Sequence, residues 1–210
     1  VSNQSIPAGE AIGYYTAMNG KFLDAIGVMS EQSQDADLTR TIAAYVHFLK
    51  GKERAGIERA VLSNTFAAAA FGPGMYKEFV SLVTEQNTYL NEFKALASPE
   101  ALAFIDQAAQ DASFARVQAY RDTAFAQAQT GGFGIEPGVW FGTITQKINK
   151  LKETEDFLST ELQTQAKAAA EAAVGAEIIY AAATVLVVLI GSIGAWWTMR
   201  SMHRPQGKLV

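Results

Sequence analysis

Arginines on predicted helices are the residues of this chain best suited to binding chemistry. Arg54 and Arg59 are five residues apart, or about 140° around a helix, so they cannot face the same pocket. By the same count, Arg59 lies within about 20° of Phe48 and Phe66, and we predict that it is a buried cation. The polar face that carries Arg54 also includes Arg40, His47 and Glu58.

Arg121 lies on an apolar stripe of a later predicted helix. The stripe follows steps of three and four residues through Phe114, Val117, Arg121 and Phe125. A guanidinium among apolar side chains must be paired, and its planar fork fits a planar oxyanion such as a carboxylate or nitrate. The partner is either an external anion or an acid of the chain itself, for which Glu53 is the candidate, and the sequence leaves both open.

The residue types give little indication of a catalytic site or a metal site. The chain has no cysteine, and His47 is the only histidine before the apolar C-terminal segment, so neither a nucleophile with its base nor a metal-ligand pattern is evident. We therefore expect no enzyme, no metal and no cofactor. With 17 Lys and Arg against 21 Asp and Glu, the net charge of −4 also argues against a nucleic-acid partner.

The elements that must position these arginines are helices, because no sustained alternation of apolar and polar residues predicts a strand. We predict an all-α bundle of four or five helices, broken where capping residues, glycine or proline occur. The breaks are expected at Asp37, at Phe71-Gly72-Pro73-Gly74, at Ser98-Pro99 and at Gly131-Gly132-Phe133-Gly134. The predicted helices cover residues 8–34, 38–70, 75–97, 99–128 and 137 onward.

The last predicted helix carries a seam of apolar residues at alternating steps of four and three, which is typical of a coiled coil. The seam consists of Ile144, Ile148, Leu151, Leu158, Leu162, Ala169, Ala172 and Ala176. We expect either a helix that pairs with a second copy in a homodimer or an ordinary helix of the bundle.

A transmembrane helix follows this seam. Residues 178–197 form an apolar run of about the 20 residues that span a bilayer, and the alternative is a buried core helix. The last acidic residue is Glu177, whereas Arg200, Arg204 and Lys208 follow the run, so the positive-inside rule predicts a cytoplasmic C-terminus. We expect a periplasmic domain at residues 1–176, a span at 177–199 in a bacterial inner membrane, and a cytoplasmic segment at 200–210.

Three stretches, in order, resemble the nitrate- and nitrite-sensing domain of bacterial sensory receptors such as methyl-accepting chemotaxis proteins. They are KERAGIERAVLSNTF (52–66), FGPGMYKEFV (71–80) and PGVWFGTITQKINKLKETED (137–156). The resemblance implies an all-helical domain whose arginines hold nitrate or nitrite. Arg59 and Arg54 match one arginine-bearing motif of the family, and Arg121 is a looser match.

Both ends of the chain bear on this resemblance. Members usually open with a helix that contains a Glu-Arg-Gly motif, and nothing like it precedes Ser5, so this helix lies upstream of Val1 or has been lost. We interpret the chain as part of a longer protein. Residues 199–210 resemble the start of a HAMP linker, with Pro205 at the expected position.

These observations favour a non-enzymatic receptor portion that binds nitrate or nitrite and signals through its last helix. The alternative is a structural or partner-binding periplasmic domain without a small-molecule ligand. Pairing of the arginines with acids of the chain would favour that alternative.

Overall fold

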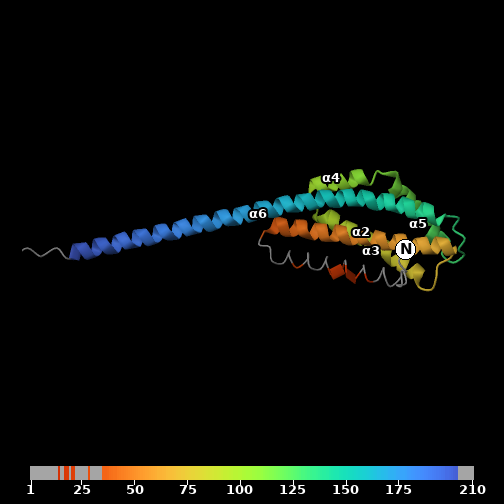
Figure 1. Cartoon of the computed structure of the whole chain (residues 1–210), viewed down its shortest axis with the longest axis horizontal. Coiled ribbons are helices and arrows are strands. Elements are labelled where there is room, and N and C mark those ends of the chain that lie inside the picture. Colours follow the sequence, from red (N-terminus) through yellow and green to blue (C-terminus); the bar gives the residue numbers. More distant parts are fainter. Residues whose placement is uncertain (1–13, 15–16, 19, 22–27, 29–34, 203–210) are drawn as a thin grey trace, which may run out of the picture. The chain divides into compact units, whose positions relative to one another are not determined.

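A computed structural model describes residues 14, 17–18, 20–21, 28 and 35–202 (Figure 1). Within these residues the chain contains helices and no strand, which confirms the all-α prediction. The helices are α2 (Ala36–Ala68), α3 (Met75–Leu96), α4 (Pro99–Ala108), α5 (Ala112–Ala126) and α6 (Pro137–Met202). The predicted helix at 8–34 and the HAMP-like residues 203–210 lie outside the described part, apart from a few isolated positions.

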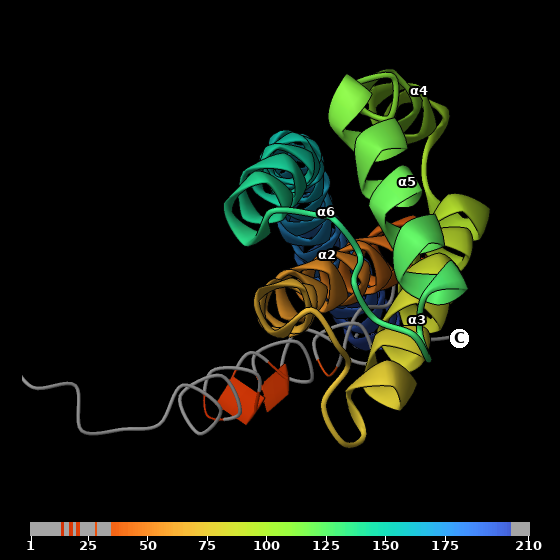
Figure 2. The ribbon, with the colours of Figure 1, turned by 90° about the vertical axis from the view of Figure 1, so that its right-hand side faces the viewer.

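The chain divides into two compact units, Val1–Thr164 and Gln165–Val210. In the first unit, α2, α3, α5 and the start of α6 enclose a shared apolar core (Figure 2). Its members include Leu62 and Phe66 of α2, Phe79 of α3, Val117 of α5 and Trp140 and Ile144 of α6. Burial of these side chains stabilises the bundle because each removes apolar surface from water.

A second core cluster in the same unit includes helix α4. Phe48 of α2 and Phe93 of α3 are fully buried and meet edge to face, with ring centroids 5.2 Å apart. Ala101 and Ile105 of α4, with Leu151 and Leu158 of α6, complete the cluster. The described part of the first unit is therefore a helical bundle with two neighbouring layers of packing.

The helix ends largely follow the predicted breaks. The Ser98 hydroxyl accepts a hydrogen bond from the Ala101 amide, as predicted for an N-cap before Pro99. Helix α2 is capped by Asp35 instead of Asp37, because the Asp35 carboxylate accepts from the amide of Asp37 at 2.9 Å. The cap predicted at Asp37 was therefore two residues late.

The predicted helix at 99–128 is wrong in one respect, because it is interrupted between α4 and α5. Asp111 has extended backbone angles and its carboxylate accepts a hydrogen bond from the Ser113 amide at 2.9 Å. This N-cap begins a new helix where apolar periodicity alone predicted a continuous one. The capping hydrogen bonds also lower the pKa of Asp111.

The glycine-rich connector before α6 fits tightly against the end of α2. Gly131 has φ +64°, and a Cβ atom there would come within 2.4 Å of the Ala69 carbonyl oxygen. Gly132 donates its amide hydrogen bond to the same oxygen at 2.8 Å. Glycine is needed at position 131 both for its backbone angle and for this close approach.

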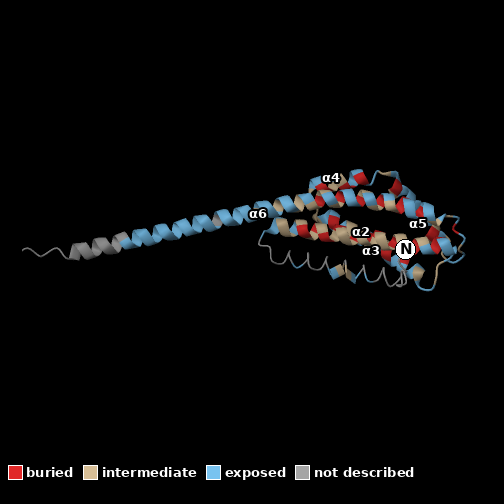
Figure 3. Cartoon of the chain, in the orientation of Figure 1, coloured by how far each residue is buried: buried red, intermediate tan, exposed pale blue. Residues whose placement is uncertain are grey.

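The first half of the apolar seam of α6 packs against other helices of the same chain. Ile144, Leu151 and Leu158 are almost completely buried in the bundle core. The alternative of an ordinary bundle helix therefore holds for Ile144, Leu151 and Leu158, whereas Ala172 is exposed. Figure 3 shows most of the later part of α6 as exposed. A contact between copies would have to use other residues.

The second unit contains an apolar helical segment that could cross a membrane. By length and composition, the described part of α6 qualifies as a membrane span, with mean hydropathy 2.3 in its most apolar window. None of that window is buried, and Ile178 to Ile190 are exposed, unlike the residues of a soluble core helix. One candidate membrane-spanning helix is therefore present in the described part of the chain.

Candidate functional site

A buried ion pair joins α2 to α5. Arg121 has 5% of its surface exposed and Glu58 none. The Nε and Nη2 atoms of Arg121 each lie 2.6 Å from a different carboxylate oxygen of Glu58. This bidentate, charge-assisted arrangement is the strongest geometry available to an arginine and a carboxylate.

Gln86 of α3 completes the polar contacts of this pair. Its side-chain oxygen accepts from Nη2 of Arg121 at 2.8 Å, and its amide nitrogen donates to Glu58 at 2.9 Å. Three helices thus contribute one side chain each to a closed hydrogen-bond network inside the bundle. Such a network fixes the positions of the helices, because removing one member leaves buried polar groups unsatisfied.

Lys147 of α6 is a second buried cation beside this network. It is 7% exposed, and its ammonium nitrogen lies 5.6 Å from the centre of the Phe114 ring. Burial, followed by the nearby positive charge of Arg121, lowers its pKa from 10.5 to about 8, against the opposing effect of Glu58. No ion pair links Lys147 to another residue of the described part.

These contacts correct three expectations about the charged residues. The buried arginine is Arg121, because Arg59 is only partly buried. The carboxylate partner of Arg121 is Glu58 and not Glu53. Glu58, predicted to share a polar face of α2 with Arg54, is completely buried.

Arg59 points to a different side of α2, next to the start of α6. Its Nη1 atom donates to the Thr145 hydroxyl at 3.1 Å, and its guanidinium carbon lies 4.8 Å from the centre of the Phe141 ring. The buried Trp140 fixes the helix here by donating its indole N–H to the Arg59 carbonyl at 3.1 Å. No carboxylate of the described residues forms an ion pair with Arg59.

Arg54 lies apart from both groups. Its Nε atom is paired with the Glu85 carboxylate on α3, and its guanidinium lies 5.9 Å from the Tyr89 ring centre. The Glu85 side chain is 43% exposed, so water competes for this pair. The three candidate arginines are therefore not brought together at one point.

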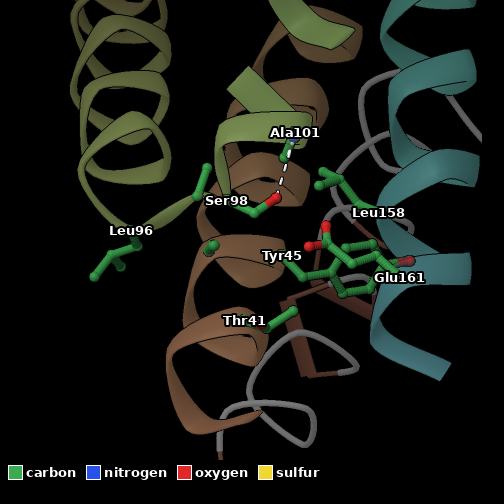
Figure 4. Close-up of a pocket in the computed structure, with 9 residues that line it drawn as sticks. Thr41, Tyr45, Leu96, Ser98, Ala101, Leu158 and Glu161 are labelled. Carbon is green, nitrogen blue, oxygen red and sulfur yellow. Dashed lines mark hydrogen bonds between the residues drawn. The ribbon is translucent and has the colours of Figure 1, made fainter. Parts of the chain in front are cut away.

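A small pocket lies at another level of the bundle, where α2, α3, α4 and α6 meet (Figure 4). Its lining includes Tyr45, Ser98, Leu158 and Glu161. Burial, followed by the negative charge of Glu155, raises the pKa of Tyr45. The volume of about 10 Å³ is enough for one water molecule but not for an anion of three or four atoms. The candidate arginines do not line this pocket.

Comparison with known proteins identifies the family. The model of the nitrate and nitrite sensing family matches residues 1–163, which is most of the chain. The chain belongs to this nitrate and nitrite sensing family. A curated relative, the nitrate regulatory protein of Klebsiella oxytoca, is 26% identical over 171 residues, covering 81% of this chain but only 43% of that protein. No solved structure matches the chain.

Membership of this sensing family agrees with the sequence resemblance, and the family is one of sensors rather than enzymes. The chain spans less than half the length of the nitrate regulatory protein it matches. The matched region includes every buried polar residue described above.

Three polar residues of the site were missed by sequence reasoning, and each left a signal on an apolar stripe. Glu58 falls at helical spacing between Ala55 and Leu62, and all three are buried. Gln86 follows Leu82 by four residues, and Lys147 lies between Ile144 and Leu151. In this chain, polar residues at core positions of apolar stripes therefore mark the buried polar groups of the site.

Proposed function

We propose that this chain is the ligand-binding portion of a bacterial transmembrane receptor that detects nitrate or nitrite. Family membership over residues 1–163 supports the ligand class, and the relative named a nitrate regulatory protein supports a role in regulation. The exposed apolar helical segment supports attachment to a membrane.

The observation that carries the proposal is the state of Arg59. Among the described residues its guanidinium contacts a hydroxyl and an aromatic ring and no carboxylate, so its planar fork still has donors to offer. Nitrate and nitrite have oxygens arranged to accept two parallel N–H bonds, as carboxylates do. Thr145 and Phe141 would frame the bound anion.

The other two predicted arginines, Arg121 and Arg54, already have carboxylate partners. The fork of Arg121 is filled by Glu58, so Arg121 shapes the bundle, and it contacts the anion only if Glu58 is displaced. Arg54 is held by a partly exposed carboxylate and can exchange partners at lower cost. We rank Arg59 first as the anion contact, with Arg54 and Arg121 after it.

Signal transmission would use α6, because this helix supplies Thr145 and Phe141 and extends to Met202. We propose a periplasmic sensor at residues 1–176, a span at 177–199 and a cytoplasmic segment at 200–210 that starts a HAMP-like linker. An anion that prefers one pose of α6 shifts the population toward it by its difference in affinity. A homodimer is expected, formed by surfaces other than the buried seam residues Ile144, Leu151 and Leu158.

Thermal unfolding of the full chain in detergent tests this function. Sodium nitrate or nitrite should raise the melting temperature relative to sodium chloride at equal ionic strength, because a ligand that binds only the folded state stabilises it. Arg59→Ala should lose this increment, while Arg116→Ala, an exposed arginine of α5, should keep it. Equal melting temperatures in nitrate, nitrite and chloride would refute the proposal.

The second candidate function is a structural or partner-binding domain. The pairing of Arg121 with Glu58 and of Arg54 with Glu85 favours it, because both guanidinium groups are already occupied. This candidate predicts no difference between nitrate and chloride in the same measurement.

A further inference from the structure

One stripe of α2 makes two polar contacts with α6. Arg59 and Lys52 are seven residues apart, which is nearly two complete turns, so their side chains leave α2 on the same side. Arg59 donates to the Thr145 hydroxyl at 3.1 Å, and the Lys52 ammonium is paired with the Glu155 carboxylate. The contacts run back along α2 and forward along α6, as in two antiparallel helices.

The ion pair of Lys52 and Glu155 lies in the interface between these helices. The Lys52 side chain is 23% exposed and the Glu155 side chain 18%, against 43% for Glu85, the partner of Arg54 on α3. Glu155 also has the ammonium of Lys152, on its own helix, at 3.7 Å. Limited exposure reduces the screening of charges by water, so this pair is held more strongly than an exposed one.

Apolar side chains form the core between α2 and α6. Leu62 and Ile144 belong to one core cluster, and Phe48 and Leu151 belong to the other. Apolar attraction has no preferred direction, whereas a charged pair is satisfied only when its two members face each other. A charged pair across this interface therefore specifies the position of α6 along α2 in a way that the apolar contacts do not.

We propose that Lys52 and Glu155 are a positioning pair for the proposed anion site at Arg59. They hold α6 at the position along α2 where Phe141 and Thr145 meet the guanidinium. The inference rests on the proposed function, and the pair, about 10 Å along α2 from Arg59, does not contact the anion itself. A shift of α6 that separates the pair also moves Thr145 away from Arg59, so the ion pair and the anion favour the same pose of α6.

Charge reversal separates positioning from a general electrostatic effect. Lys52→Glu removes positive charge near the site and Glu155→Lys adds it, so electrostatics alone predicts opposite changes in anion affinity. Positioning predicts that both reversals weaken binding, because each places two like charges at the contact. The double exchange, Lys52→Glu with Glu155→Lys, restores opposite charges and should restore affinity.

Isothermal titration of the full chain in detergent tests this, at constant ionic strength and with nitrate or nitrite, whichever the wild type binds. Each single reversal should weaken binding about threefold to tenfold, and the double exchange should return to within about twofold of the wild type. Circular dichroism checks that each variant is folded. If a reversed variant does not fold, Lys52→Gln and Glu155→Gln take its place, since positioning again predicts that both weaken binding and electrostatics predicts opposite changes.

Lys50→Glu and Glu153→Lys are the matched controls, because they make the same charge changes on the same two helices. Lys50 lies over the Tyr89 ring of α3, and Glu153 is paired with Lys150 of α6, so neither contact joins α2 to α6. Their effects should be small and opposite in sign, as electrostatics alone predicts.

Two results would overturn the inference while the proposed function stands. One is that Glu155→Lys binds the anion as tightly as the wild type or more tightly. The other is that the double exchange binds as weakly as the single reversals. If the wild type binds neither nitrate nor nitrite, the proposed function fails and this inference fails with it.

Discussion

At the scale of single residues, the buried pair of Glu58 and Arg121 dominates the described domain. Its bidentate geometry and complete burial mean that each partner depends on the other for compensation. Exchanging both for apolar residues could be tolerated, but removing one leaves an isolated charge in the core. The stability of the bundle should therefore be very sensitive to single substitutions here.

Glu58→Gln should lower the free energy of unfolding by about 3–5 kcal/mol, because Arg121 and Lys147 would then have no buried anion between them. Glu85→Gln, which removes the partly exposed partner of Arg54, should cost less than about 1 kcal/mol. Chemical unfolding followed by circular dichroism compares the two. Similar losses in both variants would contradict the assignment of Glu58 as the buried counter-charge.

Lys147 gives the domain a pH dependence of definite sign. Its pKa is lowered in the folded state from 10.5 to about 8, so between these values the unfolded chain binds more protons and stability rises with pH. The gain attributable to this residue should be about 3 kcal/mol by pH 10.5. This gain is measured as the change with pH in the difference between the free energies of unfolding of wild type and Lys147→Met. At pH 7 the Lys147→Met variant should be more stable than the wild type. Parallel pH profiles for the two proteins would show that Lys147 is not desolvated.

Sequence reasoning recognised which kinds of residue matter but not which partners they choose. Arg121 was predicted on an apolar stripe and is buried there, because helical spacing determines which side chains face the core. The burial of Glu58 and Lys147 was not predicted, because the contacts that bury them come from helices far away in the sequence. Only the packing of α2, α3, α5 and α6 brings these charges together.

At the scale of elements, the connectors show what local sequence can and cannot predict. The Ser98-Pro99 start of α4 and the glycine turn before α6 follow from residue types alone. The break before α5 does not, since apolar periodicity runs across it and the decisive feature is a hydrogen bond from the Ser113 amide to Asp111. A capping residue inside a periodic stretch competes with helix continuation, and tertiary packing decides the outcome.

Gly131→Ala tests the tight connector. The left-handed backbone angle and the approach to the Ala69 carbonyl should together cost at least about 1–3 kcal/mol. Gly138→Ala in the first turn of α6 is the control, because open space surrounds it and alanine favours the helix. Thermal unfolding distinguishes them, and equal melting temperatures for the two variants would rule out the close contact.

At the scale of the whole molecule, the proposal places the sensing bundle and the C-terminus on opposite sides of a membrane. The absence of cysteine from the sequence makes this directly testable with single introduced thiols. In intact bacterial cells with a permeabilised outer membrane, Thr164→Cys should react with a maleimide that does not cross the inner membrane. Ser201→Cys should react only after the inner membrane is disrupted. The reverse pattern would invert the topology, and labelling of both would exclude a span.

In the proposed receptor, Arg59 offers its guanidinium to nitrate or nitrite. The most direct test is calorimetric titration of the full chain at pH 6.5 with nitrate and nitrite, using chloride as the reference anion. The wild type should bind at least one of the two oxyanions with measurable heat, and Arg59→Ala should lose about tenfold or more in affinity while remaining folded. Identical heats for nitrate, nitrite and chloride, or unchanged affinity in Arg59→Ala, would contradict it.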